Sequence, residues 1–298
     1  MQRPESDSLI DNYCRYMEGQ RNFSQHTISN YTRDIRQFFS YVKTHEPGSM
    51  DITKIDLYVL RRYLGLMQRK LLNRASVLRK MASLRSFFKY LVQNGEMPAN
   101  PMMAISSPRG TRRLPKFLTI DEVNRLLDSV PIGRKETLRD RAVLELLYST
   151  GIRVSELAGL NVDAIDFSAE MIRVMGKGRK ERIVPMGSYA AKALQEYLKQ
   201  RTASESRKAV FVNKFGNRMT VRGVQRVIEK YAIVSGLKGR LTPHTLRHSC
   251  ATHMLDQGAD LRLIQEMLGH VNLSTTQIYT HVTAEKLKRI YDHAHPRA

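Results

Sequence analysis

The sequence lacks the features that define several common classes of protein. Its 298 residues include two cysteines, Cys14 and Cys250, which lie far apart and match no metal-binding spacing. No run approaches the roughly 20 apolar residues needed to cross a bilayer, and residues 1–7 lack the apolar core of a signal peptide. These absences favour a soluble protein of the reducing cytoplasm, without membrane insertion.

Motifs for metal and nucleotide chemistry are also missing. The sequence has no acidic cluster suited to paired Mg²⁺ ions, no H-E-x-x-H motif and no Walker loop. His248 and His253 lie five residues apart, whereas zinc-binding histidines on one helix lie four apart, so we interpret both as structural. We therefore expect neither a metal ion nor any other cofactor.

Acidic residues are scarce relative to basic ones. The chain carries 49 Lys+Arg against 28 Asp+Glu, a formal net charge of +21, while its 42% hydrophobic content is ordinary for a globular protein. A surface this basic repels itself unless it meets phosphates, so the composition indicates a polyanionic partner. On charge alone, a generally basic protein without such a partner is the alternative.

The length suits two domains of about 100–200 residues each. In residues 1–95, apolar residues at spacings of three and four predict a helical bundle, with helix signals at Ser24 and Asn94. Residues 96–117 are rich in proline and arginine and predict a basic linker that follows DNA, although a plain tether is also possible. Residues 118–298 form the second predicted domain.

The second domain is predicted to be mostly helical with one β element. Thr119 begins a helix that has acidic residues in its first turn, where the helix dipole prefers them. The β-rich runs Met171–Met175 and Arg182–Met186 flank a glycine turn and predict a hairpin. A helical periodicity also covers Thr283–His293, which by this pattern alone could pack on its own domain.

A long stretch of the first domain, from Leu57 to Gly95, contains no acidic residue. Helix surfaces normally mix charges, because opposite charges at i,i+4 support a helix and like charges oppose it. A stretch of one sign therefore favours a surface that faces phosphates over a solvated face. The residues that we expect to contact DNA are Arg61, Arg62, Arg69, Lys70, Arg74, Arg79, Lys80, Arg85 and Lys89.

Two arginines are candidates for binding a phosphate. Arg153 follows Gly151, directly after a predicted helix over Thr137–Thr150. Arg247 lies three residues after His244, so on a helix His244 and Arg247 project from the same side. Guanidinium groups stay charged and offer paired N–H donors to phosphate oxygens. Taken singly, each could be an ordinary surface arginine, and His244 could merely mark a helix start.

Three further residues complete the groups needed for metal-free attack on a phosphodiester. Tyr279 is the candidate nucleophile, but a phenol of pKa ~10 is only about 0.1% ionised at pH 7 and needs cations and a base nearby. His244 and His270 could exchange its proton. Lys177, between two glycines at the hairpin turn, could protonate the departing 5′ oxygen; Arg179 and Lys180 occupy the same turn and remain alternatives.

These motifs together resemble those of the tyrosine recombinase (phage-integrase-type) family, over essentially the whole chain. The matching segments are Thr150–Leu157, Gly176–Gly178, His244–Arg247, Leu268–His270 and Leu273–His281. The resemblance implies a mainly α fold with a small β-sheet, in which a SAM-like core-binding domain and a catalytic domain close around DNA as a C-shaped clamp.

The resemblance also implies a catalytic set with assigned roles and no cofactor. The set is Arg153, Lys177, His244, Arg247, His270 and Tyr279. Tyr279 would form a 3′-phosphotyrosyl link and free a 5′ hydroxyl, and a 5′ hydroxyl from a partner duplex would reseal the strand without ATP. The two arginines would hold the phosphate, Lys177 would act as general acid, and the histidines would assist proton transfer.

Within the family, the chain resembles the Xer subgroup, which resolves chromosome dimers during segregation and cell division. The compact length, the string Ser274–His281 and the ending His295–Ala298 carry this resemblance, and Val210–Lys214 and Ile290–Ala298 favour one of its two paralogues. The implied partners are a double-stranded recombination site, a paralogous Xer recombinase in a heterotetramer on two duplexes, and an FtsK-like septal DNA translocase. The Thr283–His293 helix would then dock on a neighbouring subunit.

Three other functions stay open at this point. A phage or mobile-element integrase would use the same chemistry, and a type IB topoisomerase-like enzyme would relax DNA without exchanging strands. A non-catalytic DNA-binding regulator would need the catalytic set to be incidental. The DNA target sequence does not follow from these residues.

Overall fold

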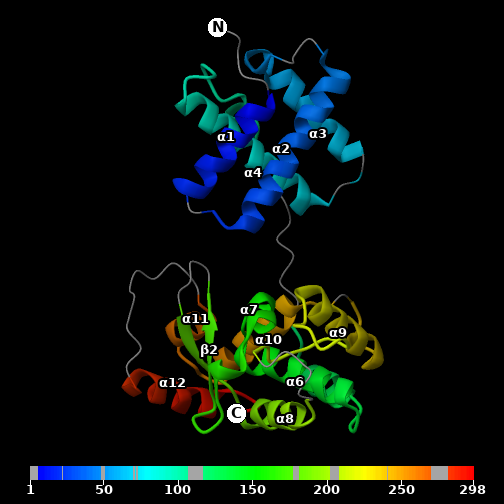
Figure 1. The fold of residues 1–298 in the computed structure, drawn as a ribbon, viewed down its shortest axis with the longest axis vertical. Coiled ribbons are helices and arrows are strands. Elements are labelled where there is room, and N and C mark those ends of the chain that lie inside the picture. The colour runs from blue at the N-terminus through cyan, green and yellow to red at the C-terminus, as the bar shows by residue number, and fades with distance from the viewer. Residues whose placement is uncertain are drawn as a thin grey trace. The chain divides into compact units, whose positions relative to one another are not determined.

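The computed structural model describes residues 6–21, 23–47, 51–69, 71, 73–106, 117–176, 181–201, 208–239, 241–269 and 281–298. The chain divides into two compact units, Met1–Arg112 and Arg113–Ala298 (Figure 1). The predicted fold class, mainly helical with a small β-sheet, is confirmed. Among the described residues, no helix combines the length and apolar character required to cross a membrane.

In the residues that the structure describes, the N-terminal unit is a bundle of four helices with two short 3₁₀ turns. Its elements are α1 (Ser6–Gly19), α2 (Gln25–His45), η2 (Ile52–Lys54), α3 (Leu57–Arg69), α4 (Arg74–Gln93) and η3 (Pro101–Ala104). The predicted helix signals are confirmed, because the Ser24 side chain accepts from the Thr27 N–H and Asn94 caps α4. The apolar stripes meet in one aromatic-rich core around Phe38, Phe87 and Phe88.

The first part of the predicted linker packs on this N-terminal unit. Met97 and Met102 are buried in its core, and the Arg85 guanidinium donates a hydrogen bond to the Ile105 carbonyl at 3.0 Å. Apolar side chains in this proline-rich stretch therefore have a place to bury themselves. The division between the two units falls after Arg112, a position inside the stretch predicted as the linker.

The C-terminal unit surrounds one central helix. Its helices are α5 (Ile120–Asp128), α6 (Lys135–Thr150), α7 (Val154–Gly159), η4 (Val162–Ala164), α8 (Ser188–Lys199), α9 (Val221–Val234), α10 (Pro243–Asp256), α11 (Leu261–Leu268) and α12 (His281–Ala294). Every residue of α6 from Ala142 to Thr150 is buried, with α8 and α10 packed against it. An uninterrupted buried run at the end of α6 fixes the position of the turn that follows.

That turn depends on Gly151. It adopts a left-handed conformation with φ 58°, and a Cβ atom there would lie 2.7 Å from Leu268 Cδ2. Glycine tolerates this conformation and the close approach, whereas an L side chain does not. The turn ends α6 and places Arg153 at the start of α7, as the sequence predicted.

The β-sheet has three antiparallel strands in the order β1-β2-β3. The predicted hairpin is confirmed as β2 (Met171–Met175) and β3 (Glu181–Pro185), paired from Met171 with Pro185 to Met175 with Glu181. The sequence prediction missed β1 (Ile165–Asp166), because two residues are too short for a periodicity. Lys177 and its neighbours to residue 180 lie outside the described residues.

The last helix, α12, packs on its own unit, beside β3 and α10. Tyr291 is fully buried, and its hydroxyl lies 2.7 Å from Ser149 Oγ on α6. After α12, the Arg297 guanidinium donates to both carboxylate oxygens of Glu145, at 3.1 and 2.7 Å. The apolar side that periodicity predicted for this helix is therefore covered by its own unit.

Candidate active site

The two predicted catalytic arginines meet at the junction of α6, α10 and α11. Arg247 on α10 donates to the carbonyl oxygens of Gly151 at 2.7 Å and Leu268 at 2.5 Å. Arg153 donates to the carbonyl of Gly269 at 2.9 Å. Residues that are about a hundred positions apart in sequence thus converge on one place.

Electrostatics makes this place attractive to an anion. Burial, and next the neighbouring charge of Arg153, lower the pKa of Arg247 to about 10. Arg247 therefore remains charged at pH 7, and the side chain of Arg153 is 35% exposed. Two close cations, one of them partly desolvated and one open to solvent, are suited to the non-bridging oxygens of a phosphate.

The carboxylate of Glu156 binds Arg153 and a further arginine, Arg182. It accepts hydrogen bonds from the backbone N–H of Arg153 at 2.8 Å and from its guanidinium at 2.9 Å. Arg182 on β3 donates two further bonds to the same carboxylate, both at 2.8 Å. Burial alone would raise the pKa of Glu156, but the hydrogen bonds and charge of Arg182 and Arg153 outweigh it and lower the pKa. Glu156 is therefore ionised at neutral pH.

Three arginines share the carboxyl end of α11. Arg182 donates to the Met267 carbonyl at 2.9 Å, Arg247 to that of Leu268, and Arg153 to that of Gly269. These are the carbonyls that a helix end leaves without partners, and cations there are also favoured by the helix dipole. The arrangement fixes Gly269, the residue that precedes His270 in sequence.

Gly269 itself leaves room for this network. Its φ is 69°, and a Cβ atom would lie 3.2 Å from the guanidinium of Arg182. A larger residue would strain the backbone and press on Arg182 at the same time. The glycine of the Leu268–His270 motif is therefore required by packing as well as by the turn.

His244 occupies the predicted place at the start of α10. It is exposed in the first turn, directly after Pro243, and Thr242 caps the helix by accepting from the Thr245 N–H. His244 and Arg247 are three residues apart on this helix, so they share one side of it. The other predicted catalytic residues, Lys177, His270 and Tyr279, lie outside the described residues.

The two histidines interpreted as structural have packing partners. His253 is buried, and its Nδ1 lies 2.8 Å from the Tyr148 hydroxyl. The His248 ring meets the edge of Phe117 at a centroid distance of 6.1 Å. Among the residues that the structure describes, no group of three or more histidine, cysteine or acidic side chains could hold a metal ion.

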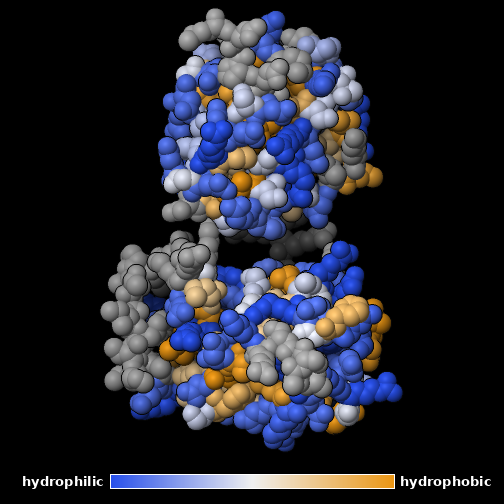
Figure 2. Space-filling model, in the orientation of Figure 1, coloured by the Kyte–Doolittle hydropathy of each residue, from blue (hydrophilic) through white to orange (hydrophobic). Residues whose placement is uncertain are grey.

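The predicted DNA-contacting residues of the N-terminal unit occupy different environments. Arg61, Arg62, Arg69, Arg74 and Lys89 are exposed on α3 and α4, on a unit whose visible surface is largely hydrophilic in Figure 2. Arg79 and Arg85 are partly buried, and Lys70 lies outside the described residues. Lys80 differs from the prediction: it is buried, and its ammonium donates to Asp34 at 3.2 Å, so it belongs to an internal ion pair rather than the open surface.

The sequence interpretation missed Glu156 and Arg182. Glu156 was visible inside the Thr150–Leu157 motif, but nothing in the spacing indicated that it binds two arginines. Arg182 and Val184 lie two residues apart on β3, so they share one face of the strand, and both are buried. An arginine at an inward-facing position of a strand needs a buried acceptor, and that signal could have identified it.

Comparisons with known proteins cover nearly the whole chain. The Phage integrase family model matches residues 116–286, and the model "Phage integrase, N-terminal SAM-like domain" matches residues 10–95. Curated relatives include tyrosine recombinase XerC of Syntrophus aciditrophicus, 46% identical over 305 residues and covering 98% of each chain. XerC of Haemophilus influenzae is 42% identical over 294 residues, again covering 98% of each chain.

Solved structures show the same fold. XerA recombinase is 30% identical, with 99% of this chain and 100% of that chain covered, at a TM-score of 0.51. The XerH site-specific recombinase bound to a palindromic difH substrate aligns at a TM-score of 0.72, covering 95% of this chain and 83% of that one. At 24% identity, the likeness to XerH concerns the fold alone.

Proposed function

The chain belongs to the phage integrase family, and from this premise we propose that it is a site-specific tyrosine recombinase, a metal- and ATP-independent enzyme that cuts and rejoins DNA. The observation that carries the proposal is the convergence of Arg153 and Arg247 on one partly open site, with Glu156 between Arg153 and Arg182. A regulator that only binds DNA would not need two cations held this rigidly beside the carboxyl end of α11.

The proposed reaction uses groups of this chain only. The Tyr279 oxygen attacks the scissile phosphorus, the bond from phosphorus to the 5′ oxygen breaks, and a 3′-phosphotyrosyl link forms. Lys177 donates a proton to the departing 5′ oxygen, while His244 and His270 carry the proton of the phenol. Arg153 and Arg247 bind the non-bridging oxygens as negative charge grows on them. A 5′ hydroxyl from the partner duplex reverses the same steps.

The biological role that we propose is resolution of chromosome dimers during segregation and cell division. It rests on full-length similarity to relatives named XerC, and the segments Val210–Lys214 and Ile290–Ala298 also favoured XerC over XerD. The partner would be a paralogous Xer recombinase in a heterotetramer on two duplexes, with a septal DNA translocase as activator. Such a role places the protein at the chromosome, in the cytoplasm.

Contact between subunits through α12 remains part of this proposal. The side of α12 that carries Leu287 and Tyr291 is buried in its own unit, and Arg297 is bound to Glu145. Docking on a neighbour would therefore use the exposed side of α12 or would require Tyr291 to leave its cavity. The first arrangement keeps the core of the C-terminal unit intact.

Covalent trapping on a suicide duplex tests the proposed chemistry. The duplex carries a nick beside the scissile phosphate of a candidate chromosomal site. After cleavage, the short fragment that carries the free 5′ hydroxyl diffuses away, so the strand cannot be resealed. The covalent protein–DNA link then accumulates and survives denaturant. We expect the link with wild type and with Tyr58→Phe, a change at an exposed tyrosine of the N-terminal unit. Tyr279→Phe should bind the duplex without forming the link. Trapping by Tyr279→Phe, or none by wild type even with a partner recombinase, would contradict the proposal.

A further inference from the structure

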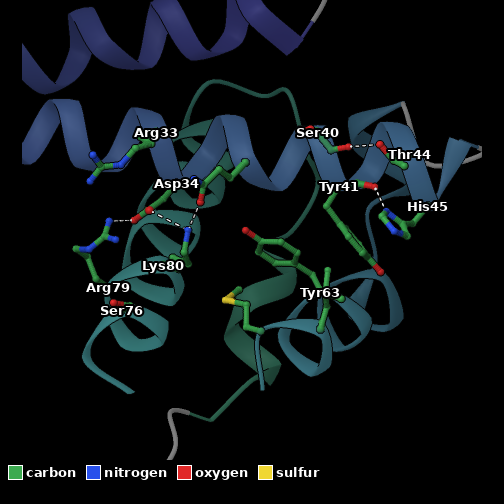
Figure 3. A pocket seen from close by; sticks show the side chains of 13 residues that line it. Arg33, Asp34, Ser40, Tyr41, Thr44, His45, Tyr63, Ser76, Arg79 and Lys80 are labelled. Carbon is green, nitrogen blue, oxygen red and sulfur yellow. Dashed lines mark hydrogen bonds and ion pairs between the residues drawn. The ribbon is translucent and has the colours of Figure 1, made fainter. Parts of the chain in front are cut away.

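A groove of about 640 Å³ opens between α2, α3 and α4 of the N-terminal unit (Figure 3). From α2 it is lined by Arg33, Asp34 and Gln37, and from α4 by Arg79 and Lys80. Arg33 and Gln37 are exposed and lie four residues apart, so they project from the same side of α2. Neither residue was among those that the sequence assigned to DNA.

The helices around the groove present no exposed carboxylate. The segments α3 and α4 contain no acidic residue, and the only acidic residue of α2 is Asp34, whose side chain is fully buried. The acid-free surface that the sequence indicated between Leu57 and Gly95 therefore extends along α2 as far as its C-cap, Glu46, which pairs with Arg62 at 2.9 Å. Such a surface is matched to a polyanion rather than to mixed charges.

Asp34 organises the floor of the groove. Its carboxylate accepts hydrogen bonds from Arg79 and Lys80, and Ser83 donates to it at 3.4 Å. The Arg79 side chain remains 33% exposed at the edge, whereas that of Lys80 is 9% exposed. Figure 3 shows Asp34 between the two cations. Two cations share one carboxylate, so the cluster keeps a net positive charge.

Lys80 also fixes the orientation of Gln37. The ammonium donates to Gln37 Oε1, and because an ammonium group can only donate, the amide oxygen must face it. The amide NH₂ of Gln37 is then turned away from Lys80. With the guanidinium groups of Arg33 and Arg79, the groove offers hydrogen-bond donors from all of its charged and amide side chains except the buried Asp34.

We propose that this groove reads a guanine at the major-groove edge of the recombination site, through Arg33 and Gln37, with Asp34 as the positioning residue; this rests on the proposed function. In the major groove guanine shows two acceptors, N7 and O6, whereas adenine and cytosine each show an amino donor there. A set of donors therefore favours guanine. The major groove is also wide enough to admit a helix such as α2.

The test uses duplexes selected by the wild-type protein from a randomised pool, in which each guanine is replaced in turn by 7-deazaguanine. This base keeps its pairing but lacks the N7 acceptor. We expect one replacement to weaken wild-type binding about tenfold, which corresponds to about 1.4 kcal/mol. The same replacement should have no further effect on Arg33→Ala or Gln37→Ala, because the contact is already lost.

Lys43→Ala is the matched control, since Lys43 is an exposed residue of α2 that does not line the groove. It should weaken binding to all duplexes alike and keep the tenfold effect of the replacement. If Arg33→Ala and Gln37→Ala behave like this control, the groove contacts phosphates only and the proposal is overturned. A wild type that shows no sensitive guanine overturns it as well.

Asp34→Asn tests the positioning role. Loss of the negative charge should leave general DNA affinity equal or higher, while the tenfold preference at the sensitive guanine disappears because Lys80 no longer holds Gln37. A merely structural role would lower both together, and an Asp34→Asn protein that discriminates like wild type would contradict positioning. If this variant does not fold, the two exposed substitutions still decide the proposal.

Covalent trapping separates this inference from the proposed function. Trapping by wild type without any sensitive guanine refutes the groove and leaves the recombinase chemistry standing. A sensitive guanine without trapping refutes the chemistry and keeps the groove as a reader of DNA.

Discussion

Each unit of this protein contains a buried carboxylate shared by two cations, and the two clusters differ in how firmly they are held. Asp34 in the N-terminal unit binds Arg79 and Lys80. Glu156 in the C-terminal unit is bound by both terminal nitrogens of Arg182 and by the backbone and guanidinium of Arg153. In addition, its arginines donate to the carbonyls of Met267 and Gly269 at 2.9 Å, whereas Arg79 lies 3.5 Å from the carbonyl of Asn30.

The difference suits the tasks that we propose for the two clusters. A binding surface must adapt to a nucleic acid, and its specificity is lost gradually when contacts shift. A catalytic site must hold groups where charge develops, and small displacements there lower the rate steeply. The more heavily bonded cluster lies where the phosphate would react.

Arg182→Ala should have the largest effect, because it removes two of the hydrogen bonds that hold the Glu156 cluster. It leaves a buried Glu156 with one partner and the Met267 carbonyl without its donor, so we expect a loss of about 3–5 kcal/mol in the free energy of unfolding. Arg173→Ala, on the exposed side of the neighbouring strand β2, is the control and should change stability by less than about 0.5 kcal/mol. Urea unfolding measures the free energy of unfolding of both variants. Equal losses would show that the ion pair of Arg182 with Glu156 does not stabilise the fold.

Arg247→Ala should separate cleavage from binding in the C-terminal unit. Removing one donor from an oxyanion site typically lowers the rate about 100- to 1000-fold, whereas a single phosphate contact contributes modestly to affinity. The rate of covalent trapping and the dissociation constant, measured on the same nicked duplex, give the two effects. Equal losses in both would assign Arg247 to binding rather than to the reaction.

Acidification should destabilise the C-terminal unit through His295. Burial lowers the pKa of His295 to about 3 in the folded protein, against about 6.5 in an unfolded chain. Between these values the unfolded state binds the extra proton, so stability is complete above pH 6.5 and falls as the pH drops, by up to about 1.4 kcal/mol per unit.

Hydrogen exchange of peptides from α6 and α12, compared at pH 7 and pH 5 after correction for the intrinsic rate, isolates this effect from the N-terminal unit. His295→Gln should reduce the difference between the two pH values. An unchanged difference in that variant would point to His253, whose pKa is also lowered by burial.

Charge reversal of Arg61 and Arg62 should give the smallest effect, and it should change DNA binding by the N-terminal unit without changing the chemistry of the C-terminal unit. Both are exposed, and each phosphate contact contributes roughly 0.9 to the slope of log K against log salt. The double Arg→Glu variant should therefore flatten the slope by about two while trapping at saturating protein persists. A slope equal to that of wild type would place these residues away from DNA.

Local sequence signals predicted local structure well. The caps at Ser24 and Thr119, the β2–β3 hairpin and the glycine turn before Arg153 all follow from the chemistry of a few neighbouring residues. Contacts between segments that are distant in sequence could not be predicted from these local signals. No periodicity indicates that Arg182 binds Glu156 or that Lys80 is buried by Asp34, because those pairings depend on how helices and strands pack.

The predicted linker is a second example of packing that composition does not predict. Proline and arginine suggested an open connector over residues 96–117, but Met97 and Met102 provide enough apolar surface to pack on the N-terminal unit. Composition averages over such single side chains. For α12, periodicity indicated a buried side correctly and could not show which surface covers it.

The three arginines at the end of α11 also set an order of events during folding. Arg153 bonds to a carbonyl 116 residues away and Arg182 to one 85 residues away. Closing loops of that length is slow relative to forming local helices. We therefore expect the contacts of Arg153 and Arg182 with the end of α11 to form late in folding, after α11 has docked. A chain caught part-way through folding, with α11 not yet docked, would lack the site that we propose for cleavage.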